Sequence, residues 1–375
     1  MPETPASPLH RIAFSMAKGM QGDAALEMLR RINSPERFFT ASAEKLKALT
    51  GIASPIFADA YRRDLLKRAD NELKFIDGNG IRPLFIGDTD FPGRLEQCTD
   101  APVMLYKLGS CPLNAARAVA VVGTRHSTHA GTEFTTRLVS DLASLMPGTV
   151  IVSGLAFGID IAAHRAAINC GLPTIAVLAH GLNTIYPSQH RSWAAKIVHG
   201  NGALLTEYTS DCRIFRGNFL ARNRIVAGLC DCIVVVESDT HGGAMSTARI
   251  ASSYGREVFA VPGRPSDQYS RGTNKLIANH SASLITCAQD LVELMGWEAQ
   301  TSFVDEPSAN YMPEVPEDLR QIYDYVLAHP DDTINDICTA INRSVNDTAD
   351  MLFRLEMADL VMQLPGGKYA PTSKR

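Results

Sequence analysis

The 375-residue sequence lacks the patterns that mark several large classes of protein. No apolar run approaches the roughly 20 residues that span a bilayer, and no basic segment followed by an apolar one marks a secretory signal at the N-terminus. The eight cysteines are scattered, without a CxxC pair or a His spacing typical of zinc. These absences predict a cytoplasmic protein with no membrane segment, no metal site and reduced, mostly buried cysteines.

The signatures of the common nucleotide enzymes are also missing. A dinucleotide site needs G-x-G-x-x-G after its first strand and an acidic residue near the end of its second. Here Gly123 and Gly131 are eight residues apart, and the second predicted strand ends in Ser153. Neither a Walker A sequence nor a G-x-S-x-G elbow is present. We therefore expect no cofactor.

Charge is balanced overall, at a net −4, but unevenly distributed. Residues 115–290 hold 15 Lys and Arg against 11 Asp and Glu, whereas residues 317–375 hold 6 against 10. A basic middle segment flanked by acidic ends indicates that nucleic acid, if bound, contacts the middle. The acidic C-terminal segment argues against a transcription regulator that reads duplex DNA with its last helices.

Composition predicts three domains and a linker. Residues 1–100 show short helices and polar turns, with a helix–Gly51–helix rhythm typical of a SAM or helix-hairpin-helix module. Residues 101–298 alternate apolar strands with helical segments. Residues 299–316 are rich in Pro, Ser, Asp and Glu, which is typical of a linker. Residues 317–375 show three amphipathic helices and a hairpin, which predict a winged helix.

The central segment predicts an α/β fold with a doubly wound, Rossmann-like parallel sheet. Near-continuous apolar strands that alternate with helices imply a sheet covered on both faces. The predicted strands are 119–123, 149–154, 174–179, 203–207, 232–237, 258–263 and 283–286.

Ligands of such folds bind at the carboxyl ends of the strands, so the residues after each strand are candidate site residues. Small residues with free N–H groups at helix starts predict an anion site, to which an arginine adds charge, and phosphate is the expected guest. The candidates are Gly123, Thr124 and Arg125 after the first strand and Ser153, Gly154 and Gly158 after the second.

A second cluster, residues 213–224, holds four arginines and two aromatic residues within twelve positions. Arginines interleaved with rings suit single-stranded nucleic acid, because the arginines contact phosphates while each ring–base stack contributes ~1–3 kcal/mol. The alternative is structural: Phe219 anchors a helix and Arg222 pairs with a carboxylate. The candidates are Arg213, Arg216, Phe219, Arg222, Asn223 and Arg224, with Gly242, Gly243, Asn274 and Lys275 from two later loops.

Several motifs in combination resemble the DNA-processing protein A (DprA/Smf) family. They are VVGTR (121–125), VSGLAFGIDIAAH (152–164), AVLAHGLNTIYP (176–187), LLTEY (204–208), FLARNRIVAGL (219–229), VVVES (234–238), VFAVPG (258–263) and GTNKLI (272–277).

The resemblance implies a homodimer that coats and protects single-stranded DNA and helps to load a RecA-type recombinase in natural transformation. It assigns Arg125 to the family's glycine–small–arginine motif and residues 219–224 to its aromatic–arginine–asparagine segment. His180 and the run 241–243 depart from the family pattern, which leaves the local loop shape open.

The main rival is an enzyme on the same Rossmann-like core, a LOG-like nucleotide phosphoribohydrolase. Aligning Gly242 and Gly243 with the PGGxGTxxE motif of those enzymes puts Arg249 at the position of the catalytic glutamate. A cation cannot act as that acid. Asp160, Glu207 and Glu237 fit structural roles better, so we expect no catalytic activity.

Overall fold

The computed structural model describes residues 7–298 and 315–372, except residues 331, 359 and 365. The chain forms two compact units, Met1–Thr301 and Ser302–Arg375, and each is described by itself. The predicted linker 299–316 contains the boundary, and its residues 299–314 lie outside the described residues.

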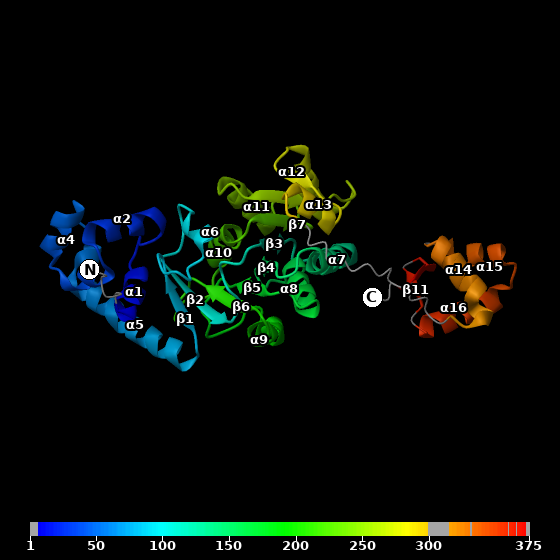
Figure 1. Ribbon diagram of the computed structural model, residues 1–375, viewed down its shortest axis with the longest axis horizontal. Helices are drawn as coiled ribbons and strands as arrows, with labels where there is room; N and C mark the ends of the chain where they lie inside the picture. Colours follow the sequence, from blue (N-terminus) through cyan, green and yellow to red (C-terminus); the bar gives the residue numbers. More distant parts are fainter. Residues whose placement is uncertain (1–6, 299–314, 331, 359, 365, 373–375) are drawn as a thin grey trace. The chain divides into compact units, whose positions relative to one another are not determined.

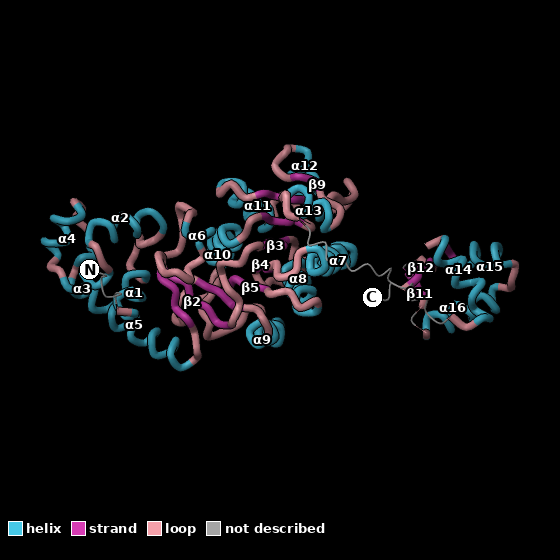
Figure 2. The backbone as a smooth tube through the Cα atoms, in the orientation of Figure 1, coloured by secondary structure: helices cyan, strands magenta, loops and turns pink. Residues whose placement is uncertain are grey.

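Among the described residues of the first unit, nine strands form one sheet (Figures 1 and 2). The order is β1-β2-β6-β5-β4-β3-β7-β8-β9, parallel from β6 to β9, with β2 antiparallel to β6 and to β1. The prediction of an α/β fold with a large parallel sheet is confirmed. The strands are β1 (Arg82–Phe85), β2 (Met104–Gly109), β3 (Ala118–Val122), β4 (Val150–Ser153), β5 (Thr174–Val177), β6 (Ala203–Thr206), β7 (Cys232–Val235), β8 (Glu257–Ala260) and β9 (Ser283–Leu284).

Helices cover both faces of this sheet because alternate residues of each buried strand point to opposite faces. On β3, Val119 and Val121 belong to a core shared with α7, α8 and α13, whereas Ala118 and Ala120 belong to a second core shared with α10, α11 and α12. The helices that follow β3 are α7 (His129–Leu145), α8 (Ile159–Asn169), η2 (Ser188–His190), α9 (Arg191–His199), α10 (Arg216–Leu229), α11 (Gly243–Ser253), η3 (Gln268–Ser270), α12 (Arg271–Ala278) and α13 (Ala288–Leu294).

The first hundred residues are mostly helical but differ from the prediction at their end. Strand β1 lies within them and joins the large sheet, because its short run RPLF pairs with β2 in a way that periodicity does not reveal. The helices share one core with the sheet, so the SAM-like assignment of 1–100 stays a prediction. The helices are α1 (Pro8–Ser15), α2 (Gly22–Ile32), α3 (Pro35–Thr40), α4 (Ala43–Thr50), η1 (Pro55–Phe57), α5 (Asp59–Gly78) and α6 (Gly93–Glu96).

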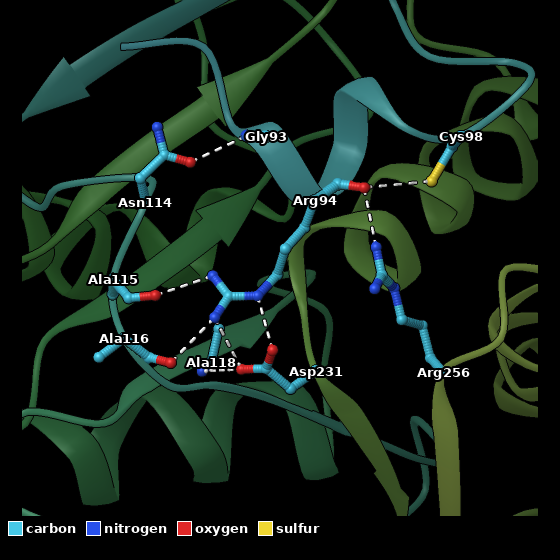
Figure 3. Close-up of polar contacts among 9 residues, drawn as sticks. All are labelled: Gly93, Arg94, Cys98, Asn114, Ala115, Ala116, Ala118, Asp231 and Arg256. Atoms are coloured by element: carbon cyan, nitrogen blue, oxygen red, sulfur yellow. Dashed lines mark hydrogen bonds and ion pairs between the residues drawn. The ribbon is translucent and has the colours of Figure 1, made fainter. Parts of the chain in front are cut away.

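Arg94 on α6 fixes the start of the central strands (Figure 3). Its guanidinium donates to the carbonyl oxygens of Ala115 and Ala116 at 2.8 and 3.0 Å and forms two bonds to the Asp231 carboxylate at 2.6 and 3.0 Å. That carboxylate also accepts the N–H of Ala118 at 2.8 Å. One side chain therefore holds β3 and β7 in place at the edge opposite the carboxyl ends.

The second unit has its own apolar core and a small antiparallel sheet of order β10-β12-β11. The predicted three helices and hairpin are present, although residue 365 of the predicted turn is outside the described residues, and β10 was not predicted. The winged-helix assignment stays a prediction. The elements are η4 (Glu317–Leu319), α14 (Arg320–Ala328), β10 (Asp332–Thr333), α15 (Ile334–Ile341), α16 (Val345–Met357), β11 (Val361–Leu364) and β12 (Lys368–Pro371).

Candidate nucleic-acid interface

A groove with a volume of about 1220 Å³ lies at the carboxyl edge of the large sheet. It is located where β3 has β4 on one side and β7 on the other, so the connections after neighbouring strands diverge to opposite faces. Such a switch point opens a crevice beyond the strand ends. The groove is lined by the β3–α7 turn, the β4–α8 loop, α10, α11 and the loop before α12.

The structure brings most of the predicted site residues together in this groove. The lining includes Gly123, Thr124, Arg125, Gly154, Arg216, Phe219, Arg222, Asn223, Gly242 and Gly243. The predicted residues outside the lining are Ser153, Gly158, Arg213, Arg224, Asn274 and Lys275.

One wall of the groove is an arginine–aromatic stack. The guanidinium carbon of Arg125 lies 5.4 Å from the centre of the Phe219 ring, and the Tyr186 ring meets Phe219 edge-on with centres 5.6 Å apart. A guanidinium over a ring gains a cation–π contact and keeps its N–H edge available to an anion. The wall therefore offers a hydrogen-bond donor for a phosphate beside two ring surfaces.

The mouth of the groove exposes further apolar side chains next to a cation. Phe215 is 61% exposed, directly before Arg216 at the start of α10, and Ile214 and Leu220 are also exposed. Single exposed apolar residues are ordinary, but a cluster rimmed by polar groups marks an interaction site. The groove is thus open to a ligand with apolar faces and negative charge.

At the β3–α7 turn, the N–H groups predicted to bind a phosphate have a partner within the chain. The carboxylate of Glu237 accepts the backbone N–H of Thr128 at 2.9 Å and also the Thr128 hydroxyl. A Cβ on Gly131 would lie 2.3 Å from the Glu237 carboxyl carbon, so glycine leaves room for that carboxylate. The chain's own acid therefore occupies the place expected for a phosphate, while the Arg125 side chain stays exposed.

In the β4–α8 loop, a carboxylate of the chain likewise accepts the backbone N–H groups. Asp160 accepts the N–H groups of Gly154 and Ala156 at 3.1 and 3.4 Å. Burial raises the pKa of Asp160, and the nearby Arg222 opposes that rise. Gly158 has φ +75°, and a Cβ there would lie 2.2 Å from the carbonyl oxygen of Thr124, so it lets two loops meet closely.

Arg222 and Arg224 hold loops together, which corrects the prediction that they contact phosphates. Arg222 is only 4% exposed, and its Nη1 donates to the carbonyl oxygens of Gly154, at 2.7 Å, and Val177. Arg224 forms a largely buried ion pair with Glu207, whose pKa is raised by burial against the effect of that arginine. Arg222 therefore has a structural role through backbone carbonyl oxygens and not through the ion pair of the alternative, and Arg224 has one through its pair with Glu207.

The loops after β7 and β8 contribute unequally. Gly242 and Gly243 begin α11 on the groove. Asn274 instead bonds both the N–H and the carbonyl of Gly263, at 3.1 and 2.8 Å, which closes its own loop. Lys275 is exposed outside the groove.

Sequence reasoning missed three aromatic residues of the lining: Tyr186, His126 and Tyr269. His126 and Tyr269 stack with centres 6.4 Å apart on loops that follow β3 and β8. Tyr186 lies in the quoted stretch 176–187, so its motif was a usable signal. Nothing in the sequence indicates that residues 126 and 269 meet, since this depends on the packing of two distant loops.

Among the described residues, no group of three or more His, Cys, Asp or Glu side chains is placed to hold a metal ion. No helix formed by these residues is long and apolar enough to cross a bilayer.

Fold and groove define an α/β protein with an arginine–aromatic groove at the switch point of its sheet. A family model described as DNA recombination-mediator protein A matches residues 82–296, and the chain belongs to this family. Protein Smf of Escherichia coli (strain K12) is 33% identical over 288 residues, which cover 76% of each chain. The predicted DprA/Smf membership is confirmed.

Solved structures agree with this assignment. The X-ray structure of DNA processing protein A (DprA) from Streptococcus pneumoniae is similar with a TM-score of 0.66 and 30% identity, over 77% of this chain and 98% of that one. DNA processing protein A from Helicobacter pylori, a structure that addresses a single-stranded DNA binding mode, is similar with a TM-score of 0.51 and 32% identity, over 57% and 95%.

Proposed function

We propose that this protein binds single-stranded DNA in the groove and has no catalytic activity of its own. The observation that carries the proposal is the wall in which Arg125 stacks on Phe219 beside Tyr186. An arginine contacts a phosphate while rings stack on unpaired bases, which is the chemistry that single strands need. Exposed Phe215 and Arg216 extend the same pattern at the mouth.

The wider role that we propose is protection of single-stranded DNA and its transfer to a RecA-type recombinase in natural transformation. Support comes from family membership and from the Helicobacter pylori relative, which is described for single-stranded DNA binding. We further propose a homodimer that acts in the cytoplasm.

The enzyme alternative has little support in the groove. Hydrolysis of a glycosidic bond needs a carboxylate that can reach the bond. Asp160 is buried and bonded to two backbone N–H groups, and Glu237 is engaged by Thr128. Arg249, which the motif alignment puts in place of the catalytic glutamate, lines the groove.

The first prediction concerns strand preference and salt. We expect tighter binding to single-stranded than to duplex DNA, because paired bases cannot stack on Phe219. Affinity should fall as salt rises, since phosphate contacts release counterions. Fluorescence anisotropy with matched single- and double-stranded oligonucleotides over a salt series measures both. Equal or tighter duplex binding, or indifference to salt, contradicts the proposal.

A second prediction concerns the C-terminal unit. A chain that ends before residue 317 should keep most of its affinity for single-stranded DNA, because the removed segment carries 10 acidic and 6 basic residues. The groove lies wholly in the first unit. A large loss of affinity in the same anisotropy assay would instead give the proposed winged helix the main role.

A third prediction concerns assembly. Two tethered grooves raise the affinity for a long strand by roughly 10²–10⁴ relative to one groove, through effective concentration. We therefore expect a dimer in light scattering and a disproportionate gain in affinity from short to long oligonucleotides. A monomer whose affinity ignores DNA length is the contrary outcome. We place the dimer contact around residues 276–294, where Leu284 and Leu294 are exposed.

A further inference from the structure

We propose that single-stranded DNA leaving the groove crosses a second contact surface on α8 and α9, the Trp193 patch, made of Arg165, Trp193 and Lys196. The proposal rests on the proposed function, because the patch extends the path of the same ligand. Neither the sequence motifs nor the groove includes any of these three residues.

The centre of the patch is an indole ring between two cations. The guanidinium carbon of Arg165 lies 5.1 Å from the Trp193 ring, and the ammonium nitrogen of Lys196 lies 4.2 Å from it. One cation over a ring is a common surface contact, found about once per 70–80 residues. Two cations on one ring, brought by different helices, concentrate positive charge at a single aromatic surface.

This charge has no acid near it along the chain and no ion-pair partner among the described residues. The sequence contains no Asp or Glu from Ile161 to Thr206, a stretch that includes most of α8 and all of α9. Within the described part of the chain, neither Arg165 nor Lys196 forms an ion pair. An anion bound here would therefore gain charge contacts without breaking an existing bridge.

The two helices of the patch begin a few residues after residues of the groove lining. Helix α8 begins three residues after Ala156, which lines the groove, and the exposed Phe157 ring lies edge-on to His190 at 4.8 Å. His190 directly precedes α9, and α8 and α9 lie side by side (Figures 1 and 2). Arg165 is six residues into the helix, roughly 9 Å from its start. A strand that passes Tyr186 can thus continue over Phe157 to the patch.

The chemistry of the patch fits an unpaired strand. A base that stacks on Trp193 replaces one of the cations over the ring, and that cation can then contact the adjacent phosphate. Stacking on an aromatic ring tolerates every base, because each base has a π-face. A duplex keeps its bases paired and offers no such face.

Tryptophan fluorescence tests the patch directly, because the chain has two tryptophans, Trp193 and Trp297. A Trp297→Phe variant leaves position 193 as the reporter. We expect an oligothymidylate of about thirty nucleotides to quench this signal and one of about six, near the lower end of the ~4–16 nucleotides that a binding module covers, to leave it unchanged. Equal quenching by both lengths, or quenching by neither while the long strand binds, overturns the proposal.

Affinities of the complete chain provide the second measurement. Trp193→Ala should weaken binding of the long strand about fivefold or more and leave the short strand within about twofold, whereas Trp193→Phe should restore most of the loss. In the double variant Arg165→Gln with Lys196→Gln, the slope of log affinity against log salt concentration should become less steep by about 0.7 per removed cation. Equal losses at both lengths would indicate a structural role. Absence of binding at any length refutes the proposed function itself, whereas binding that ignores Trp193 refutes only the patch.

Discussion

Replacing Phe215 and Phe219 together with alanine is expected to weaken single-stranded DNA binding about thirtyfold or more. Each ring–base stack contributes ~1–3 kcal/mol, so the loss of two stacks costs at least ~2 kcal/mol. Phe219 also supports the guanidinium of Arg125 at 5.4 Å, so its removal frees that side chain from its fixed position. Anisotropy with a labelled oligothymidylate measures the change.

A matched control separates stacking in the groove from a general effect of losing an exposed ring. Phe353 on α16 of the second unit is 59% exposed, close to the exposure of Phe215, and lies outside the groove. Phe353→Ala should bind DNA as the parent chain does. If it loses as much affinity as the double variant, or if the double variant binds normally, the groove is not the site.

Arg125→Ala tests the same groove by removing the proposed phosphate contact. The expected loss is on the order of 1–3 kcal/mol for every DNA sequence, because a phosphate contact carries no base information. Combining it with Phe219→Ala should cost less than the sum of the single losses, since Arg125 and Phe219 are in contact. Additive losses would show that the stacked pair does not act as a unit.

Strand positions could be predicted because they depend on local patterns. The apolar runs that became β3, β4 and β7 are buried at every position, and such runs identify parallel strands whatever the tertiary contacts. Carboxyl-edge residues such as Arg125 then follow from topology, whereas Phe219 follows from the arginine–aromatic pattern of its cluster. β1 and β2 escaped prediction because neither shows a regular alternation of buried and exposed residues.

The chemistry of individual donors could not be predicted in the same way. The N–H groups after β3 and β4 are free in the sequence pattern, but Glu237 and Asp160 reach them from other parts of the fold or from the next helical turn. Likewise, the sequence of an arginine cluster does not indicate which arginine faces solvent and which contacts carbonyl oxygens. Only the packing of α10 distinguishes Arg216, which is exposed, from Arg222, which is buried.

That distinction leads to the largest expected effect on stability. Arg222→Met should lower the free energy of unfolding by about 3–5 kcal/mol, because it leaves the buried Asp160 without a nearby opposite charge. It also removes the donor to the carbonyl oxygens of Gly154 and Val177. Arg216→Met, six residues earlier on the same helix, should unfold at the same urea concentration as the parent and bind DNA more weakly.

The pH dependence of the stability lost in Arg222→Met tests the role of Asp160 independently. Burial already raises the pKa of Asp160 in the folded chain, and Arg222 counteracts this, so its loss raises that pKa further. A carboxyl whose pKa is raised by folding favours the folded state once it is protonated and disfavours it when it is charged. In urea unfolding, the difference in unfolding free energy between the parent and Arg222→Met should therefore shrink as the pH falls toward the ordinary pKa range of an aspartate. A difference that grows or stays constant on acidification would mean that Arg222 acts through its carbonyl contacts and not through the charge of Asp160.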